Sequence, residues 1–153
     1  MGRSVRARPE VAVVAVVAAA LGGWMYGLGW LCAVLVHELG HGLAARASGA
    51  DAPLMDLQLG AGDVYAPPGL AVLGSGVAAS ACVLFAVVLA DVGSAAFQVA
   101  FFHWLLFQAT PHPSSDSGVW LRGELTRRGC SERRAFLIVA WGAALSIPCA
   151  LLA

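Results

Sequence analysis

The sequence predicts an all-α integral membrane protein with about five transmembrane helices. Hydrophobic residues make up 59% of the 153-residue chain, and only 12% of residues are charged. Soluble domains are about one quarter charged, so this chain lacks the polar surface that a soluble globule needs. Several apolar runs also approach the roughly 20 residues of a membrane-spanning helix. We therefore expect residues 1–153 to form a single domain embedded in a lipid bilayer.

Five apolar segments define the expected helices, and the first two are almost continuous. A single helix over both would be about 55 Å long, which exceeds a hydrocarbon core of about 30 Å. We expect a tight hairpin between them, at Gly22-Gly23 or at 27–29, because glycine permits sharp turns. In the alternative interpretation, the first segment is a cleaved signal peptide. The segments run over about 11–26, 28–47, 69–90, 95–110 and 135–152.

The basic residues predict the orientation in the membrane. All nine are arginines, and they lie near the N-terminus, at Arg46 and in the loop 112–134. Basic residues favour the cytoplasmic side, and the five segments place all nine on one side. We expect a multi-pass protein of a bacterial inner membrane, with a cytoplasmic N-terminus. Binding of nucleic acid is not expected, because the loop is short and lacks interleaved aromatic residues.

The stretch 51–68 is too short and too polar to span a membrane. Residues 55–59 alternate apolar and polar side chains, which is typical of a strand. The glycines in 60–63 indicate a turn, and Val64-Tyr65 is a possible return strand. We therefore expect a small β-hairpin or a re-entrant loop at the cytoplasmic face.

The second segment carries the motif HELGH, from His37 to His41. Residues four apart share one helix face, so both histidines can bind one metal ion, and Glu38 can hold a metal-bound water as general base. A chance match is a weak alternative, because a His-Glu pair inside a membrane helix is costly without a function. Zinc requires a third protein ligand, for which the loop offers two candidates, Asp116 and Glu124.

Three stretches resemble the site-2 protease family of intramembrane zinc metalloproteases. The sequence 37–49, HELGHGLAARASG, is similar to the family's extended HExxH motif. The sequence 108–118, QATPHPSSDSG, resembles its N-x-x-P-x-P-x-x-D-G-G motif, and 74–80, GSGVAAS, resembles the glycine-containing start of its middle core helix. The resemblance covers about 28–118, which leaves the first and last apolar segments as additional helices.

The resemblance implies a zinc site completed by Asp116, which falls on the aspartate of the second motif. The motif also makes Gln108 and Pro111 candidate substrate contacts. His112, beside the Asp116 loop, is a further candidate that could contact either substrate or solvent. The chain departs from the family pattern at two positions: Gln108 stands in place of asparagine and Ser117 in place of glycine. These departures concern substrate positioning, not the three metal ligands.

The expected activity is hydrolysis of a peptide bond within or near a transmembrane segment of a membrane-protein substrate, with one Zn²⁺ ion as cofactor. Glu38 would take the proton of the metal-bound water and pass it to the leaving amine. A non-proteolytic membrane scaffold is the main alternative, and the departures at Gln108 and Ser117 favour it. A third hypothesis is a membrane zinc protease that cuts soluble loops, with Glu124 as ligand. No sequence feature indicates an oligomeric state.

Three further features have structural interpretations. His103, in the middle of the fourth segment, is expected to be an interhelical hydrogen-bond partner. Small residues crowd 74–81, which favours close approach of this segment to the HELGH helix. The cysteines form no CxxC pair, so we expect small buried hydrophobes and no disulfide or cysteine-based zinc site.

Overall fold

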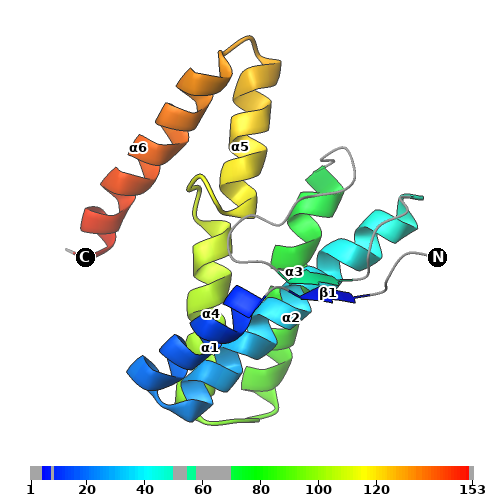
Figure 1. The fold of residues 1–153 in the computed structure, drawn as a ribbon, viewed down its shortest axis with the longest axis vertical. Helices are drawn as coiled ribbons and strands as arrows, with labels where there is room; N and C mark the ends of the chain where they lie inside the picture. The colour runs from blue at the N-terminus through cyan, green and yellow to red at the C-terminus, as the bar shows by residue number, and fades with distance from the viewer. Residues whose placement is uncertain (1–4, 8, 50–54, 58–69, 152–153) are drawn as a thin grey trace.

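The computed structural model describes residues 5–7, 9–49, 55–57 and 70–151, which form six helices and two short strands (Figure 1). The predominantly helical architecture confirms the predicted all-α class. Five of the helices match the predicted apolar segments, with boundaries that differ by a few residues. The elements are β1 (Val5–Ala7), α1 (Pro9–Gly22), α2 (Trp24–Ala47), β2 (Met55–Leu57), α3 (Leu70–Leu89), α4 (Ala95–Ala109), α5 (Asp116–Arg127) and α6 (Glu132–Leu151).

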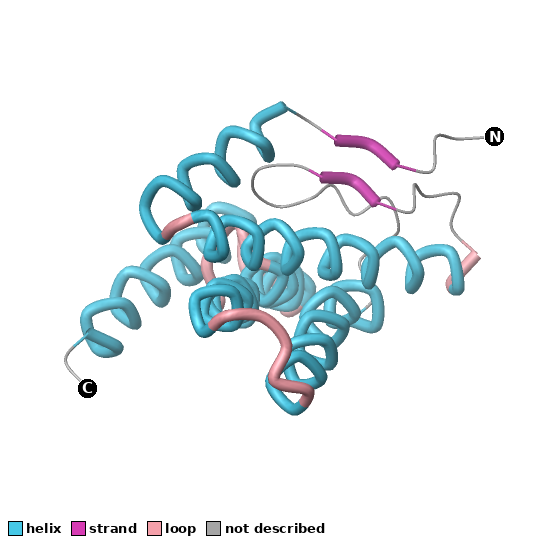
Figure 2. The backbone as a smooth tube through the Cα atoms, turned by 90° about the horizontal axis from the view of Figure 1, so that it is seen from below, coloured by secondary structure: helices cyan, strands magenta, loops and turns pink. Residues whose placement is uncertain are grey.

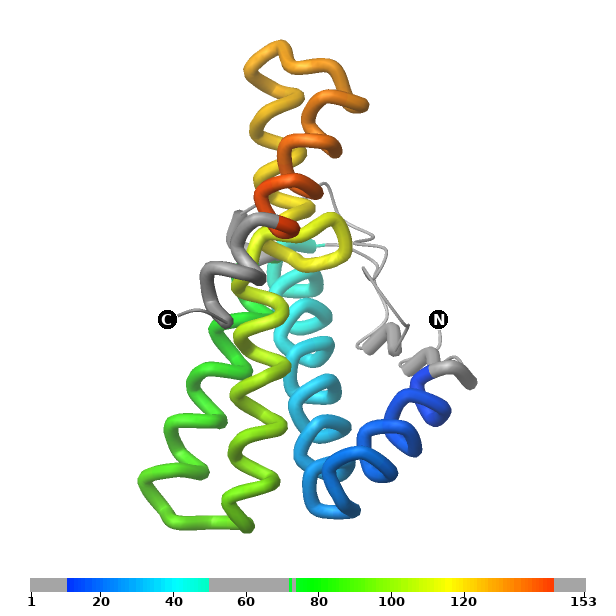
Figure 3. Tube along the Cα trace, turned by 90° about the vertical axis from the view of Figure 1, so that its left-hand side faces the viewer, coloured from blue at the N-terminus to red at the C-terminus, as the bar shows by residue number. Residues whose placement is uncertain are grey.

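Helix α2 is the centre of the fold and packs against α1, α3 and α4. Figure 3 shows α2, α3 and α4 side by side, with α1 inclined away from them. The turn between α1 and α2 lies at Gly23, whose φ of 85° suits glycine. This confirms the first of the two predicted hairpin positions. The other, 27–29, lies inside α2, where Gly29 packs closely against the backbone of Phe97 in α4.

The predicted loop 112–134 is wrong in one respect, because it contains the helix α5. Its Ser115 is the N-cap residue and accepts a hydrogen bond from the backbone N–H of Gly118. Helix α6 returns antiparallel to α5 and packs against it, and Ala135, Val139 and Ala143 of α6 are buried. The α5–α6 hairpin projects from the α1–α4 bundle (Figure 1).

The strand expected near Met55 exists, but its partner was not predicted. Strand β2 pairs in parallel with β1, with Arg6 opposite Asp56 (Figure 2). The expected return strand Val64-Tyr65 lies outside the described residues. A two-stranded parallel ribbon between distant segments therefore takes the place of a local hairpin within the described part of the chain.

Among the described residues, one helix, α2, is long and apolar enough to cross a membrane. The other apolar helices found there, 11–22, 74–89 and 95–109, are shorter. Many of their large side chains are nevertheless exposed, including Leu21, Phe85 and Leu89. The outer surface of the bundle is thus strongly apolar.

Candidate metal centre

Three potential metal ligands converge between α2 and the start of α5. The Nε2 atoms of His37 and His41 lie 3.1 and 2.9 Å from Oδ2 of Asp116, and 3.1 Å from each other. His37 is fully buried, and the other two side chains are mostly buried. The structure thus brings together the three residues that the sequence analysis assigned to a metal site.

The fold explains how residues so distant in sequence meet. His37 and His41 lie one helical turn apart on α2, so their side chains share a face. Asp116 is the first residue of α5, which follows the end of α4 after a short loop, and α4 packs against α2. The Ser115 hydroxyl holds this loop, since it accepts the N–H of His112 and donates to the carbonyl oxygen of Thr110, 2.7 Å away.

Helix α3 orients the second histidine. Nδ1 of His41 lies 2.7 Å from the backbone carbonyl oxygen of Val72. A carbonyl only accepts, so Nδ1 carries the proton and Nε2 presents its lone pair to the other ligands. Gly76, one turn further along α3, lies against the imidazoles: a Cβ atom there would fall 2.8 Å from Cε1 of His37. The absence of a side chain at Gly76 makes room for both rings.

The polar atoms of this triad lie close enough to share a proton or a metal ion. Burial raises the pKa of Asp116, but the adjacent imidazoles of His37 and His41 outweigh it and lower the pKa to about 2. The carboxylate is therefore ionised at neutral pH. Two imidazole nitrogens at 3.1 Å from each other, both beside this oxygen, would direct lone pairs at one another unless a proton or a metal ion lay between them.

The donor set and its dimensions fit zinc. Two imidazoles and one carboxylate are typical of catalytic zinc sites, which keep a fourth position open for water. Zinc–ligand bonds of about 2.0–2.1 Å in a tetrahedral arrangement place ligand atoms about 3.3 Å apart. The observed separations of 2.9–3.1 Å are a few tenths of an ångström shorter, which small side-chain rotations accommodate.

The two glutamates of interest occupy different environments. Glu38 follows His37 on α2 and is half-buried. Glu124 lies two turns beyond Asp116 on α5, where its carboxylate accepts hydrogen bonds of 2.8 and 2.9 Å from Arg127. A further bond of 2.7 Å comes from Arg128. The geometry therefore places Asp116, not Glu124, with the histidines.

The proposed substrate-contacting residues surround the Asp116 loop. Gln108 is buried at the end of α4, and its side-chain oxygen accepts a hydrogen bond from the backbone N–H of Asp116. Pro111 is exposed. The ring of His112 packs against that of Phe107, with centroids 4.1 Å apart, and burial lowers its pKa. Contact of these residues with a substrate stays a prediction.

His103 has the structural role that the sequence indicated. Its Nδ1 atom is hydrogen-bonded to the hydroxyl of Tyr26, 2.9 Å away, which links α4 to α2. This bond lies at the end of the bundle where α1 turns into α2. The prediction that His103 is an interhelical hydrogen-bond partner is confirmed.

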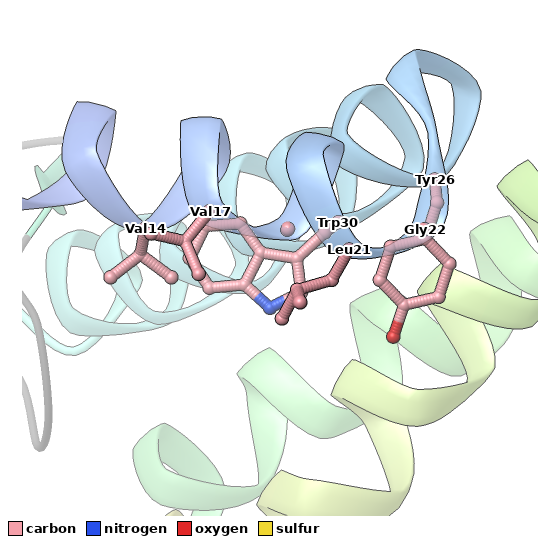
Figure 4. A pocket seen from close by; sticks show the side chains of 7 residues that line it. Val14, Val17, Leu21, Gly22, Tyr26 and Trp30 are labelled. Carbon is pink, nitrogen blue, oxygen red and sulfur yellow. The ribbon is translucent and has the colours of Figure 1, made fainter.

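A groove of about 480 Å³ runs between α1 and α2 and is lined mainly by apolar side chains (Figure 4). Val14 and Val17 line it from α1, and Tyr26 and Trp30 from α2. None of the three ligands borders it. The edge-to-face contacts of Trp30 with Trp104, and of Trp104 with His37, place two indole rings between the groove and the metal centre.

Three residues of the centre were not identified from the sequence. Val72 acts through its backbone carbonyl, which any residue would supply, so no signal could have revealed it. Gly76 falls within the small-residue stretch 74–81, which predicted close helix packing but not contact with the ligands. Trp104 packs on His37 from α4, with ring centroids 5.7 Å apart, and neither spacing nor motif indicated this contact.

Comparisons of the chain with protein-family models, with curated proteins and with solved structures found no match.

Proposed function

We propose that this protein is an intramembrane zinc metalloprotease of the site-2 protease type. The observation that carries the proposal is the convergence of His37, His41 and Asp116 within about 3 Å, beside a glutamate that follows the first histidine. The resemblance of stretches 37–49 and 108–118 to the two family motifs supports it. Both stretches meet at this one centre.

A zinc ion held by the three ligands would act as a Lewis acid and lower the pKa of a bound water. Glu38 is the general base: its carboxylate accepts a proton from the attacking water and delivers it to the nitrogen of the breaking C–N bond. The carbonyl oxygen of Val72 keeps Nε2 of His41 deprotonated throughout. The products are a carboxylate and an amine.

Apolar outer surfaces support a location in the membrane. Leu21 is 85% exposed, Leu89 is 70% exposed and Phe85 is 66% exposed, on two different helices. Soluble monomers rarely expose contiguous apolar surface of this kind, whereas lipid covers it without cost. We propose that α1–α4 and α6 enter the bilayer and that the metal centre opens toward the cytoplasm.

The substrate is a transmembrane segment of another protein. A peptide bond within a helix is shielded by its own hydrogen bonds, so the segment must unwind locally before cleavage.

The geometry bears differently on the two alternatives. Gln108 and Ser117 make hydrogen bonds at the metal-centre loop and leave the triad intact, but a scaffold that keeps the fold and the metal would have the same geometry, so cleavage decides between it and the protease. The hypothesis with Glu124 as ligand loses its geometric basis, because two arginines hold that carboxylate.

The proposal is tested by reconstituting the purified chain in liposomes with a set of transmembrane substrates. The expected result is one zinc ion per chain, with cleavage that a chelator abolishes and added Zn²⁺ restores. Stoichiometric zinc without cleavage of any substrate would favour the scaffold.

A further inference from the structure

We infer that Gln108 and Ser117 act together as positioning residues that set Asp116 at the metal centre. These are the two positions at which the chain departs from the family motif. The inference rests on the proposed metal site, and it assigns these two residues a role different from substrate contact. Its basis is a pair of hydrogen bonds that cross the α4–α5 junction.

The first bond joins the side chain of Gln108 to the main chain of Asp116. Oε1 of Gln108 lies 3.2 Å from the backbone nitrogen of Asp116. That N–H can only donate, so it fixes which end of the amide faces Asp116. Asp116 begins α5, so its N–H has no partner within the helix, and Gln108 supplies one. Gln108 is only 6% exposed, so water cannot readily replace this bond.

The second bond runs in the opposite direction. The hydroxyl of Ser117 donates to the backbone carbonyl oxygen of Gln108, 2.9 Å away. This carbonyl belongs to the last turn of α4, where carbonyls lack partners within the helix. A glycine at position 117 would have no hydroxyl to make the bond. Each of the two departures thus satisfies a group at a helix end.

Together the two bonds close a ring between the end of α4 and the start of α5. On the α5 side, one bond is made by the backbone nitrogen of Asp116 and the other by the hydroxyl of the next residue, Ser117. The Cα of Asp116 lies in the chain between these two bonded groups. This Cα is therefore held relative to α4, which packs against the histidine-bearing helix α2. Because a carboxylate must reach both Nε2 atoms within about 3 Å, a small shift of this Cα would weaken metal binding.

The test is a set of thermodynamic cycles with Co²⁺ as the probe, using the purified full-length chain in detergent. Co²⁺ affinity and the intensity of its visible absorption, which depends on coordination geometry, are measured for the wild type, Gln108→Met, Asp116→Ala and the double variant. Gln98→Met, also on α4, is the matched control.

Gln108→Met should lower Co²⁺ affinity by roughly 10- to 100-fold, the usual cost of losing a partner that orients a ligand, and should weaken the absorption. In the Asp116→Ala background the same change should have no further effect, because Gln108 acts through Asp116. Gln98→Met should behave as wild type. An equal loss in both backgrounds, or no loss in the wild-type background, would overturn the inference.

Ser117→Ala provides a second, milder variant that decides the matter if Gln108→Met does not fold. Its expected effect is a smaller loss of Co²⁺ affinity that again disappears in the Asp116→Ala background. Ser114→Ala, an exposed serine of the same loop, is its control. A loss that persists without Asp116 would contradict the positioning role.

The outcomes separate this inference from the proposed function. A wild-type chain that binds no Co²⁺ or Zn²⁺ would overturn both. Metal binding without coupling between Gln108 and Asp116 would overturn the inference alone. Coupling in a chain that cuts no transmembrane substrate would uphold the positioning role and overturn the protease proposal.

Discussion

Gly76 of α3 lies against His41 of α2, and the two residues leave no room for a side chain between them. Gly76→Ala would drive a Cβ into the imidazoles of His41 and His37. Overpacking of this kind costs about 1–3 kcal/mol of stability. We predict that Gly76→Ala weakens zinc binding and lowers the melting temperature, measured by metal titration and by thermal denaturation.

Gly74→Ala is the matched control, because an added Cβ at Gly74 would have no neighbour within 4 Å. It should leave zinc affinity unchanged. If the two variants bound zinc equally well, the close contact of α3 with the metal ligands would be refuted.

The ligand set predicts opposite outcomes for two acidic residues of α5. Asp116→Ala removes one of three ligands and should reduce zinc affinity by more than the roughly 100-fold that loss of an orienting partner costs. Glu124→Ala should leave zinc affinity unchanged, because Arg127 and Arg128 hold that carboxylate away from the histidines. Zinc analysis of both purified variants decides between them. Loss of zinc in Glu124→Ala alone would restore the hypothesis of the downstream glutamate.

The topology predicts different accessibility at two turns that lie at opposite ends of the molecule (Figure 1). In a variant without native cysteines, Val92→Cys, between α3 and α4, should react with an impermeant thiol reagent on intact cells. Thr126→Cys, near the end of α5, should react only after permeabilisation, because the proposed topology places the arginine-rich segment in the cytoplasm. Labelling of Thr126→Cys from outside would reverse the proposed orientation.

The ion pairs of α5 predict that the carboxyl group of Glu124 titrates at acidic pH. Hydrogen bonds from Arg127 and Arg128 lower the pKa of Glu124 from 4.5 to about 2. Because the folded-state pKa is depressed, the stabilising contribution is complete above about pH 4.5 and is lost as the pH falls toward 2. A carboxyl NMR titration should show this midpoint in the wild type and a midpoint nearer 4.5 in the Arg127→Gln/Arg128→Gln variant. Equal midpoints would show that the ion pairs do not form in solution.

The two histidines could be predicted from the sequence because their spacing is local. His37 and His41 share a helix face whatever the rest of the fold, whereas the residues alone left Asp116 and Glu124 both open as third ligand, and the motif resemblance favoured Asp116. The carbonyl of Val72 could not be predicted, because every residue offers the same backbone group. Only the packing of α3 on α2 brings it to His41.

Two parts of the fold prediction were wrong or incomplete, for separate physical reasons. Helix α5 was hidden by its polar, arginine-rich composition, although Ser115 followed by Asp116 is a good start signal for a helix. The partner of Met55–Leu57 is Val5–Ala7, about 50 residues earlier. Alternation of apolar and polar residues predicts a strand but carries no information about which distant segment pairs with it.

Glu38→Gln tests the central claim most directly, because it separates metal binding from catalysis. Glutamine keeps the size of the side chain but cannot accept the proton of the attacking water. General acid–base catalysis contributes about 100- to 10,000-fold in rate. The purified variant should fold, retain one zinc ion per chain and cut a transmembrane substrate slower by this factor, whereas His37→Ala should lose both zinc and activity. Equal cleavage by wild type and Glu38→Gln, with zinc bound in both and varied substrates offered, would contradict the protease assignment.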